Sequence, residues 1–187
     1  MGIEKNEMEM PNKRNARNGS WFLALIFTAI MGVVITGFAH QIGPERPAFA
    51  FWLNGLLMVW AVGFYRSKPL QWRNGYFRIR PWETPVYRAL GVPGFQRFLR
   101  RVNWFNREIQ LKTGRRGLSY LDHAIRQAEQ GHATIFVIIG GFTVFAIVHY
   151  GWGTAWWYVL FNVLFNGYPV MVQRYNRARM QRVLNRR

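Results

Sequence analysis

Hydrophobic residues gather in four long segments of the chain, separated by polar stretches. Each segment has 18 to 21 residues and contains no Asp, Glu, Lys or Arg. About 20 apolar residues are needed for a helix to cross the hydrocarbon core of a bilayer. The pattern therefore predicts four transmembrane helices in two hairpins, at 21–65 and 133–172. The four segments are 21–39, 47–65, 133–150 and 152–172.

Composition supports a membrane protein over a soluble one. Half of the residues are hydrophobic and 17% are aromatic. A soluble protein that buried four such helices would need a far larger polar shell than 187 residues provide. We therefore expect an all-α membrane protein. Aromatic residues at or near the segment ends fit the aromatic belts of membrane proteins: Trp21, Tyr65, Trp152, Trp156 and Trp157.

Positive charge is abundant and unevenly distributed. The chain has 25 Lys and Arg against 8 Asp and Glu. All of these cations except Arg46 fall in three stretches, 1–20, 66–132 and 173–187, which four spans would place on one side of the membrane. By the positive-inside rule that side is cytoplasmic. We expect a multi-pass protein of the cell inner (cytoplasmic) membrane with both termini in the cytoplasm and a mobile N-terminal stretch.

The stretch 66–132 is basic but also rich in aromatic residues. Its first part, around 72–87, predicts an irregular or β-like path, whereas apolar residues between Phe95 and Ile109 recur at helical spacing with arginines on the other faces. Such a helix fits an amphipathic, membrane-lying cytoplasmic segment that contacts anionic lipids. The alternative is a solvated amphipathic helix on a small cytoplasmic domain. No nucleic-acid-binding module is visible, so we expect no nucleic-acid partner.

A candidate catalytic pair lies just before the third span. Residues 118–132 predict a helix that continues into that span, with Asp122, Glu129 and His132 among its apolar positions. Glu129 and His132 have the i, i+3 spacing at which a carboxylate can orient an imidazole. This arrangement suits a general base that deprotonates a hydroxyl. The structural alternative is a Glu–His pair that only closes the cytoplasmic end of the span.

A second group of candidates runs along the fourth span into the tail. Asn162, Asn166, Gln173 and Asn176 share one helical face, and Pro169 frees a backbone carbonyl one turn earlier. Tyr175 of the same helix is a further candidate for binding the substrate. Polar residues in a span usually face the bundle or a cavity, although their role can be packing alone. The arginines that follow suit a donor phosphate or an anionic lipid: Arg174, Arg177 and Arg179.

Other kinds of chemistry receive little support. The chain has no cysteine, and it shows no metal-ligand spacing, no GxSxG motif, no P-loop and no dinucleotide fingerprint. We therefore expect no metal site and no bound cofactor.

Three motifs in the same order resemble the glycosyl-4,4'-diaponeurosporenoate acyltransferase family. They are YFRIRPWE at 76–83, AExxH at 128–132 and the closing NxxxxxxQRYNRxR at 166–179, of which QRYNR is the most specific. The resemblance covers about 72–187. Ala178 departs from the family pattern, where we expect a proline.

The resemblance implies an enzyme that transfers a fatty acyl group to a sugar hydroxyl of a glycosylated carotenoid. The implied co-substrate is acyl-CoA or an acyl-carrier protein, and the acceptor is that carotenoid or a similar glycolipid. On this hypothesis His132 is the base, the amide residues bind the sugar, and the arginines hold the donor. The alternative from another class is a non-catalytic membrane scaffold, or a lipid- or pigment-binding subunit. The sequence does not indicate an oligomeric state.

Overall fold

The computed structural model describes residues 13–67, 72, 75–101 and 115–185, and the regular structure in these ranges is entirely helical. The all-α prediction is therefore confirmed. The elements are α1 (Lys13–Ile42), α2 (Pro47–Ser67), α3 (Glu83–Ala89), α4 (Val92–Arg101), α5 (Arg115–Tyr150), α6 (Trp152–Asn162), the π-helical turn η1 (Val163–Gly167) and α7 (Tyr168–Asn185).

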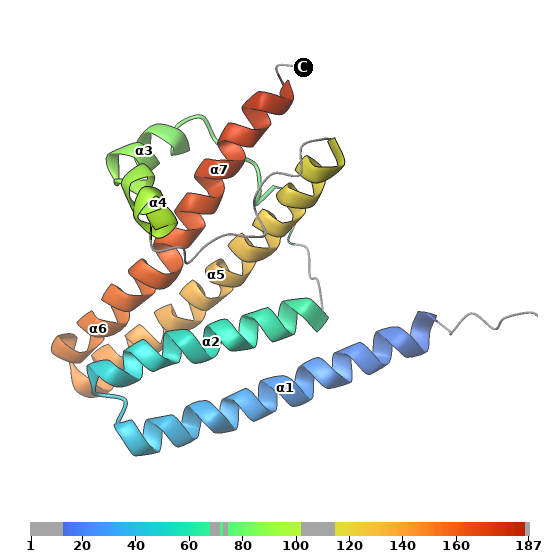
Figure 1. Cartoon of the computed structure of the whole chain (residues 1–187). Coiled ribbons are helices and arrows are strands. Elements are labelled where there is room, and N and C mark those ends of the chain that lie inside the picture. The colour runs from blue at the N-terminus through green and yellow to red at the C-terminus, as the bar shows by residue number, and fades with distance from the viewer. Residues whose placement is uncertain (1–12, 68–71, 73–74, 102–114, 186–187) are drawn as a thin grey trace, which may run out of the picture.

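Two helical hairpins form the body of the molecule (Figure 1). In the first, α1 packs on α2; in the second, α5 packs on the nearly continuous path of α6, η1 and α7. The hairpins meet because α2 lies against both α5 and α6. The short helices α3 and α4 pack on α7, and so the residues before α3 lie close to the C-terminal helix.

The core lies where α2, α5 and α6 meet. Residues at every fourth position of α2 are buried, from Phe49 through Leu53 and Leu57 to Tyr65, because residues four apart form one ridge of a helix. Ile135 of α5 belongs to the same core. The phenol oxygen of Tyr65 also lies 2.7 Å from Oγ1 of Thr134, which links α2 and α5 through a polar contact.

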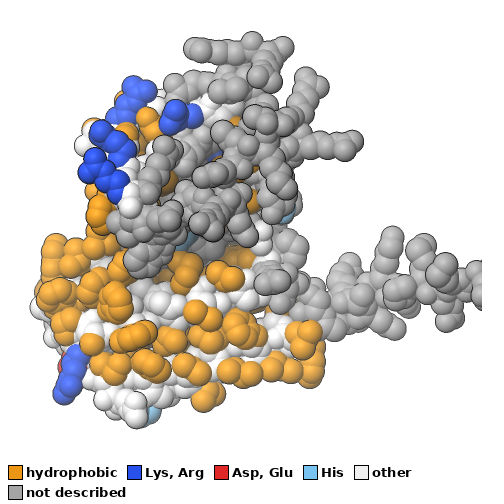
Figure 2. Space-filling model, in the orientation of Figure 1, with side chains coloured by type: hydrophobic (Ala, Val, Ile, Leu, Met, Phe, Trp, Pro, Cys, Tyr) orange, Lys and Arg blue, Asp and Glu red, His pale blue; other side chains and the backbone are white. Residues whose placement is uncertain are grey.

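The outer surface of the hairpins is apolar, as Figure 2 shows for one face. Val33, Val137 and Val148 are each at least 70% exposed. Within the described part of the chain, three helices are long and apolar enough to cross a membrane: Trp21–Ile42, Pro47–Tyr65 and Leu121–Tyr150. Exposed valines on such helices are typical of chains whose solvent is lipid.

Two parts of the predicted architecture stay predictions. The segment 152–172 forms α6, η1 and the start of α7, and it is not among the helices that meet the length and composition for a span. The placement of the amphipathic segment on a membrane is likewise untested. Its predicted helix at 95–109 corresponds to α4 up to Arg101, and the remainder lies outside the described residues.

The helix expected at 118–132 is part of α5, which runs without a break into the apolar segment at 133–150. Residues 75–82 form turns and irregular backbone with no strand among them, whereas 83–87, expected on the same irregular path, belong to helix α3. At the N-terminus, α1 begins at Lys13, inside the stretch predicted to be mobile.

Candidate functional site

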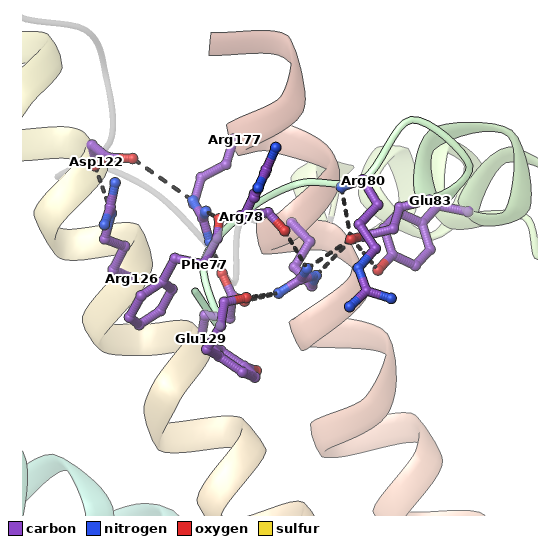
Figure 3. Close-up of polar contacts among 11 residues, drawn as sticks. Phe77, Arg78, Arg80, Glu83, Asp122, Arg126, Glu129 and Arg177 are labelled. Atoms are coloured by element: carbon purple, nitrogen blue, oxygen red, sulfur yellow. Dashed lines mark hydrogen bonds and ion pairs between the residues drawn. The ribbon is translucent and has the colours of Figure 1, made fainter. Parts of the chain in front are cut away.

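Two groups of polar side chains lie between α5 and the C-terminal helical path. We call the first the charged cluster: Glu83, Asp122, Arg126, Glu129, Arg174 and Arg177. Figure 3 shows how its ion pairs connect α5, α7 and the backbone before α3. We call the second the amide cluster: Asn54, His132, Asn162 and Asn166.

Arg174 of α7 lies at the centre of the charged cluster. Its Nε and Nη2 donate to the two carboxylate oxygens of Glu83, each at 2.8 Å, and its Nη1 donates to Oε1 of Glu129 at 2.8 Å. Nη1 also donates to the carbonyl oxygen of Tyr76 at 3.0 Å. The planar guanidinium suits this role because its five donors can serve two carboxylates and the backbone together.

Arg177 lies one turn further along α7 and is fully buried. Its Nη1 donates to Oε2 of Glu129 at 2.5 Å, and its Nη2 donates to the carbonyl oxygen of Phe77. Its Nε lies 3.7 Å from Oδ1 of Asp122, whose other oxygen accepts from Arg126 at 2.7 Å. The guanidinium also stacks over the ring of Phe77, 5.2 Å from its centroid.

Groups at the start of α3 hold the Glu83 carboxylate in position for its bonds with Arg174. Its carboxylate accepts from the backbone N–H of Arg80 and from the Tyr87 hydroxyl, both at 2.9 Å. Burial alone would raise the pKa of Glu83, but the bonds from Arg174, Arg80 and Tyr87 together hold it below its usual value. Burial and the bond to Glu83 raise the pKa of Tyr87 to about 12, so its hydroxyl keeps the proton that it donates.

The charge of Arg174 is secured by the same contacts. Burial disfavours a charged guanidinium, but Glu83 and Glu129 raise the pKa of Arg174 above its ordinary value. Glu83 is thus ionised beside an arginine that stays protonated. The cluster therefore holds residues 76–82, which have no regular structure, and Glu83 at the start of α3 against α5 and α7.

The amide cluster joins α2, α5 and the π-helical turn. The side-chain nitrogen of Asn166 donates to the amide oxygens of Asn54 at 2.8 Å and of Asn162 at 3.0 Å. The side-chain N–H of Asn54 donates to the Ala50 carbonyl at 2.9 Å, and that of Asn162 donates to the Phe136 carbonyl at 3.0 Å. Backbone carbonyls only accept, so they fix which end of each amide points at Asn166.

This chain of bonds determines the state of His132. Both amide hydrogens of Asn166 are used, so its oxygen is the atom that faces Nδ1 of the imidazole, at 3.4 Å. The oxygen only accepts, and therefore Nδ1 carries a proton; when the ring is neutral, Nε2 holds the lone pair. The ring also forms a hydrogen bond with the backbone of Phe165. The Phe165 carbonyl lacks the donor that a regular α-helix would supply, because Pro169 has no N–H.

The structure corrects the expected pairing of Glu129 with His132. The two carboxylate oxygens of Glu129 bind Arg174 and Arg177, while His132 faces Asn166. The spacing allowed a pair on α5, but two guanidinium groups offer charge-assisted bonds that a neutral imidazole does not.

The arginines expected to hold a donor also differ from one another. Arg177 has no exposed surface, so in this structure it cannot meet a phosphate. Arg174 is tied to Glu83 and Glu129. Arg179 is exposed and is the one of the three with access to a soluble or headgroup anion.

The polar stripe of the fourth segment is divided among several neighbours. Asn162 and Asn166 belong to the amide cluster, whereas Oδ1 of Asn176 accepts from Gln96 of α4 at 2.8 Å. Gln173 and Tyr175 are buried, and the amide oxygen of Gln173 has no hydrogen-bond partner among the described residues. The expected single groove is therefore not what the described contacts show.

Three residues of these clusters are not among the candidates taken from the sequence: Asn54, Glu83 and Arg126. Asn54 is one amide in an apolar span, and only its position among buried residues reveals it. Glu83 had a usable signal, because it is the only carboxylate between Glu45 and Glu108 in a very basic stretch. A scarce acid among many arginines is the expected centre of a buried ion pair. The described residues contain no group of three or more His, Asp or Glu placed to hold a metal ion.

Comparison with known proteins agrees with the motifs. Residues 73–186, more than half of the chain, match the family described as glycosyl-4,4'-diaponeurosporenoate acyltransferase. No curated protein and no solved structure matches the chain significantly. The matched range includes Glu83, His132, Asn166 and the QRYNR motif at 173–177. The chain therefore belongs to the glycosyl-4,4'-diaponeurosporenoate acyltransferase family, an acyltransferase family of carotenoid glycoside modification.

Proposed function

We propose that this protein transfers a fatty acyl group from a thioester donor to a sugar hydroxyl of a glycosylated carotenoid or a similar glycolipid. One observation carries the proposal: His132 is buried between helices with Nδ1 facing Asn166, which leaves Nε2 as the acceptor nitrogen. A neutral imidazole with a defined acceptor nitrogen is the form that a general base requires.

The reaction can be written with these groups. Nε2 of His132 takes the proton of the sugar hydroxyl, and the sugar oxygen attacks the carbonyl carbon of the donor. The carbon–sulfur bond of the thioester then breaks, and the thiol leaves with the proton that His132 returns. The products are the sugar ester and free CoA or carrier thiol.

The described contacts modify the roles that the motifs implied. Both amide hydrogens of Asn166 are engaged, so we assign Asn166 to holding the imidazole and Asn162 to holding Asn166. Gln173 is the amide that we assign to the acceptor, because its buried oxygen is free to accept from a sugar hydroxyl. Tyr175 and Asn176 keep Gln173 on a packed helix.

The donor would approach over α3 and α4. Arg78, Arg80, Arg88, Arg97 and Arg101 are exposed, and Lys and Arg side chains gather over these helices in Figure 2. Large apolar side chains are exposed in the same region: Trp82, Val86, Leu90 and Phe98. A surface that combines cations and apolar groups suits a headgroup layer. We place it, with Arg179 and both termini, at the cytoplasmic face of the cell membrane.

The test is the lipid product. Membranes from cells that make the glycosylated carotenoid are analysed by mass spectrometry after expression of the natural protein and of His132→Ala. A new acyl ester is expected with the natural protein, and a loss of about 100-fold or more with H132A, which is the usual scale for a general base. His149→Ala serves as the control, because His149 lies at the opposite end of the α5 span.

Two outcomes would contradict the proposal. Ester formation that persists in H132A would remove His132 as the base. Absence of any new ester with the natural protein, in membranes that contain acceptor and donor, would instead favour a lipid- or pigment-binding subunit.

A further inference from the structure

One member of the amide cluster lies outside the part of the chain that matches the family. The match begins at residue 73, whereas Asn54 lies in α2. Asn54 is seven residues from the start of α2, about 10 Å along the helix at 1.5 Å per residue. Its side chain is buried at the contact of α2 with α5 and α6.

The contacts of Asn54 give it one defined orientation. Its nitrogen donates to the Ala50 carbonyl at 2.9 Å, and its oxygen accepts from Asn166 at 2.8 Å. Asn166 is an amide and has two possible orientations, which differ in whether oxygen or nitrogen faces His132. Asn54 and Asn162 both present oxygen, and together they select the orientation in which the oxygen of Asn166 faces the imidazole.

We propose that Asn54 is a positioning residue of the acyl-transfer site, which fixes the tautomer of His132 through Asn166. The inference rests on the proposed function only for its catalytic consequence. The N-terminal hairpin is then part of the catalytic unit, because the family-matched region alone lacks one of the two acceptors that orient Asn166.

Loss of the Asn54 acceptor has a specific consequence. Without this acceptor, only the oxygen of Asn162 opposes rotation of the Asn166 amide, and in the molecules where the amide rotates its nitrogen faces Nδ1 of His132. A nitrogen that donates requires an acceptor, so the proton moves to Nε2 and the lone pair to Nδ1. The nitrogen proposed to take the sugar proton is then blocked.

The experiment compares four forms of the full-length protein in lipid nanodiscs. Asn54→Leu has nearly the same shape and no acceptor. Asn54→Asp retains an oxygen that accepts from Asn166. Thr134→Val removes the polar contact of α5 with Tyr65, elsewhere on the same α2–α5 interface, and is the matched structural control. The readouts are the ¹⁵N chemical shifts of histidine-labelled protein, assigned to His132 with H132A, and the rate of ester formation.

In the natural protein, Nδ1 of His132 is expected to be protonated and Nε2 unprotonated. In N54L the two ring nitrogens should exchange these states in a measurable fraction of molecules. The turnover number should fall about 10- to 100-fold, the loss typical of removing a group that orients a functional histidine. N54D should restore both readouts, and T134V should leave both unchanged.

A further variant guards against loss of folding in N54L. Asn54→Thr can donate to the Ala50 carbonyl, as Thr28, Thr36 and Thr143 do to the carbonyls four residues before them. Its hydroxyl is one bond closer to the backbone than the Asn54 oxygen and does not reach Asn166. N54T should therefore fold and show the same change at the imidazole.

The two hypotheses fail in different ways. Unchanged ring nitrogens in folded N54L and N54T would overturn the role of Asn54, whatever the activity. A nitrogen exchange in a protein that forms no ester would support Asn54 as the orienting residue and would refute the acyl-transfer function.

Discussion

The charged cluster and the amide cluster both join α5 to the C-terminal helical path, and they use different groups to do so. Glu129 and His132 are three residues apart on α5, about 4.5 Å along the axis, yet one binds two arginines and the other a neutral amide. In the charged cluster the two central arginines and Glu129 are occupied by each other and by the backbone. In the amide cluster the nitrogen proposed as the base, Nε2 of His132, lies outside the chain of amide bonds. The charged cluster, whose groups pair with one another, thus has a structural role. The neighbouring amide cluster, which is uncharged, holds the candidate catalytic residue His132.

The largest expected effect comes from removing the shared carboxylate. Glu129→Gln leaves Arg177 fully buried, with the Phe77 carbonyl as an acceptor and only the distant Asp122 as a partner of opposite charge. Breaking a buried ion pair in this way costs about 3–5 kcal/mol. We expect a large loss of thermal stability of the protein in detergent, together with loss of activity. Asp122→Asn is the control: its pair with Arg126 is partly exposed, and its contact with Arg177 is long while Arg177 keeps Glu129, so it should cost about 1 kcal/mol or less.

A double variant sharpens this test. Replacement of Arg177 by Met in the E129Q background removes the unpaired charge, and it should recover part of the lost stability. If E129Q alone unfolds no more readily than D122N, the charged cluster is not the support of the site.

A conservative change at Arg174 should have a smaller effect. Arg174→Lys keeps the charge but cannot make paired bonds to Glu83 while also reaching Glu129 and the Tyr76 carbonyl. We expect a loss of about 1–3 kcal/mol in unfolding free energy. The KM for the acyl donor should stay unchanged, since the role is structural. A raised donor KM with unchanged stability would return Arg174 to donor binding.

Arg179 should show the opposite behaviour. Its side chain is exposed on α7. Arg179→Ala should leave the melting temperature unchanged and raise the donor KM by about 3- to 10-fold, the loss of one solvent-exposed phosphate contact of about 1 kcal/mol. The measurement is ester formation against donor concentration in nanodiscs of neutral lipid. A KM equal to that of the natural protein would exclude this contact.

The smallest effect concerns pH. The pKa of Glu83 in the folded protein lies below its ordinary value of 4.5. Its ionised form is therefore favoured by folding: this stabilisation is complete above about pH 4.5 and is lost as the pH falls through the lower folded pKa. Melting temperatures of the natural protein should decline over that acidic range. Glu83→Gln should be less stable near neutral pH and should show a smaller decline. Equal slopes would contradict the shift.

Hydrophobic length and spacing were enough to predict the helices of both hairpins and the continuation of 118–132 into the third segment. Buried polarity was also predictable, since Glu129, His132, Asn162 and Asn166 stand out among apolar neighbours. The hydrogen-bond partners of these residues were not predictable from the sequence. Helical spacing places Glu129 beside His132, but it carries no information on which distant arginine competes for the carboxylate. Asn54 and Glu83 belong to the clusters only through their contacts with Asn166 and Arg174, which lie 112 and 91 residues away in the sequence.

The π-helical turn fixes the direction in which the side chains of the C-terminal helical path face. η1 holds five residues, Val163–Gly167, in a wider turn than the helices on either side of it, and so takes up about one residue more than a regular turn. Upstream of it Asn162 meets α5, within it Asn166 meets α2, and downstream Arg174 and Arg177 meet Glu129. Deletion of one residue there would turn everything that follows by about 100°. The rotational positions of the charged cluster and of the amide cluster about this helical path therefore depend on the same extra residue in η1.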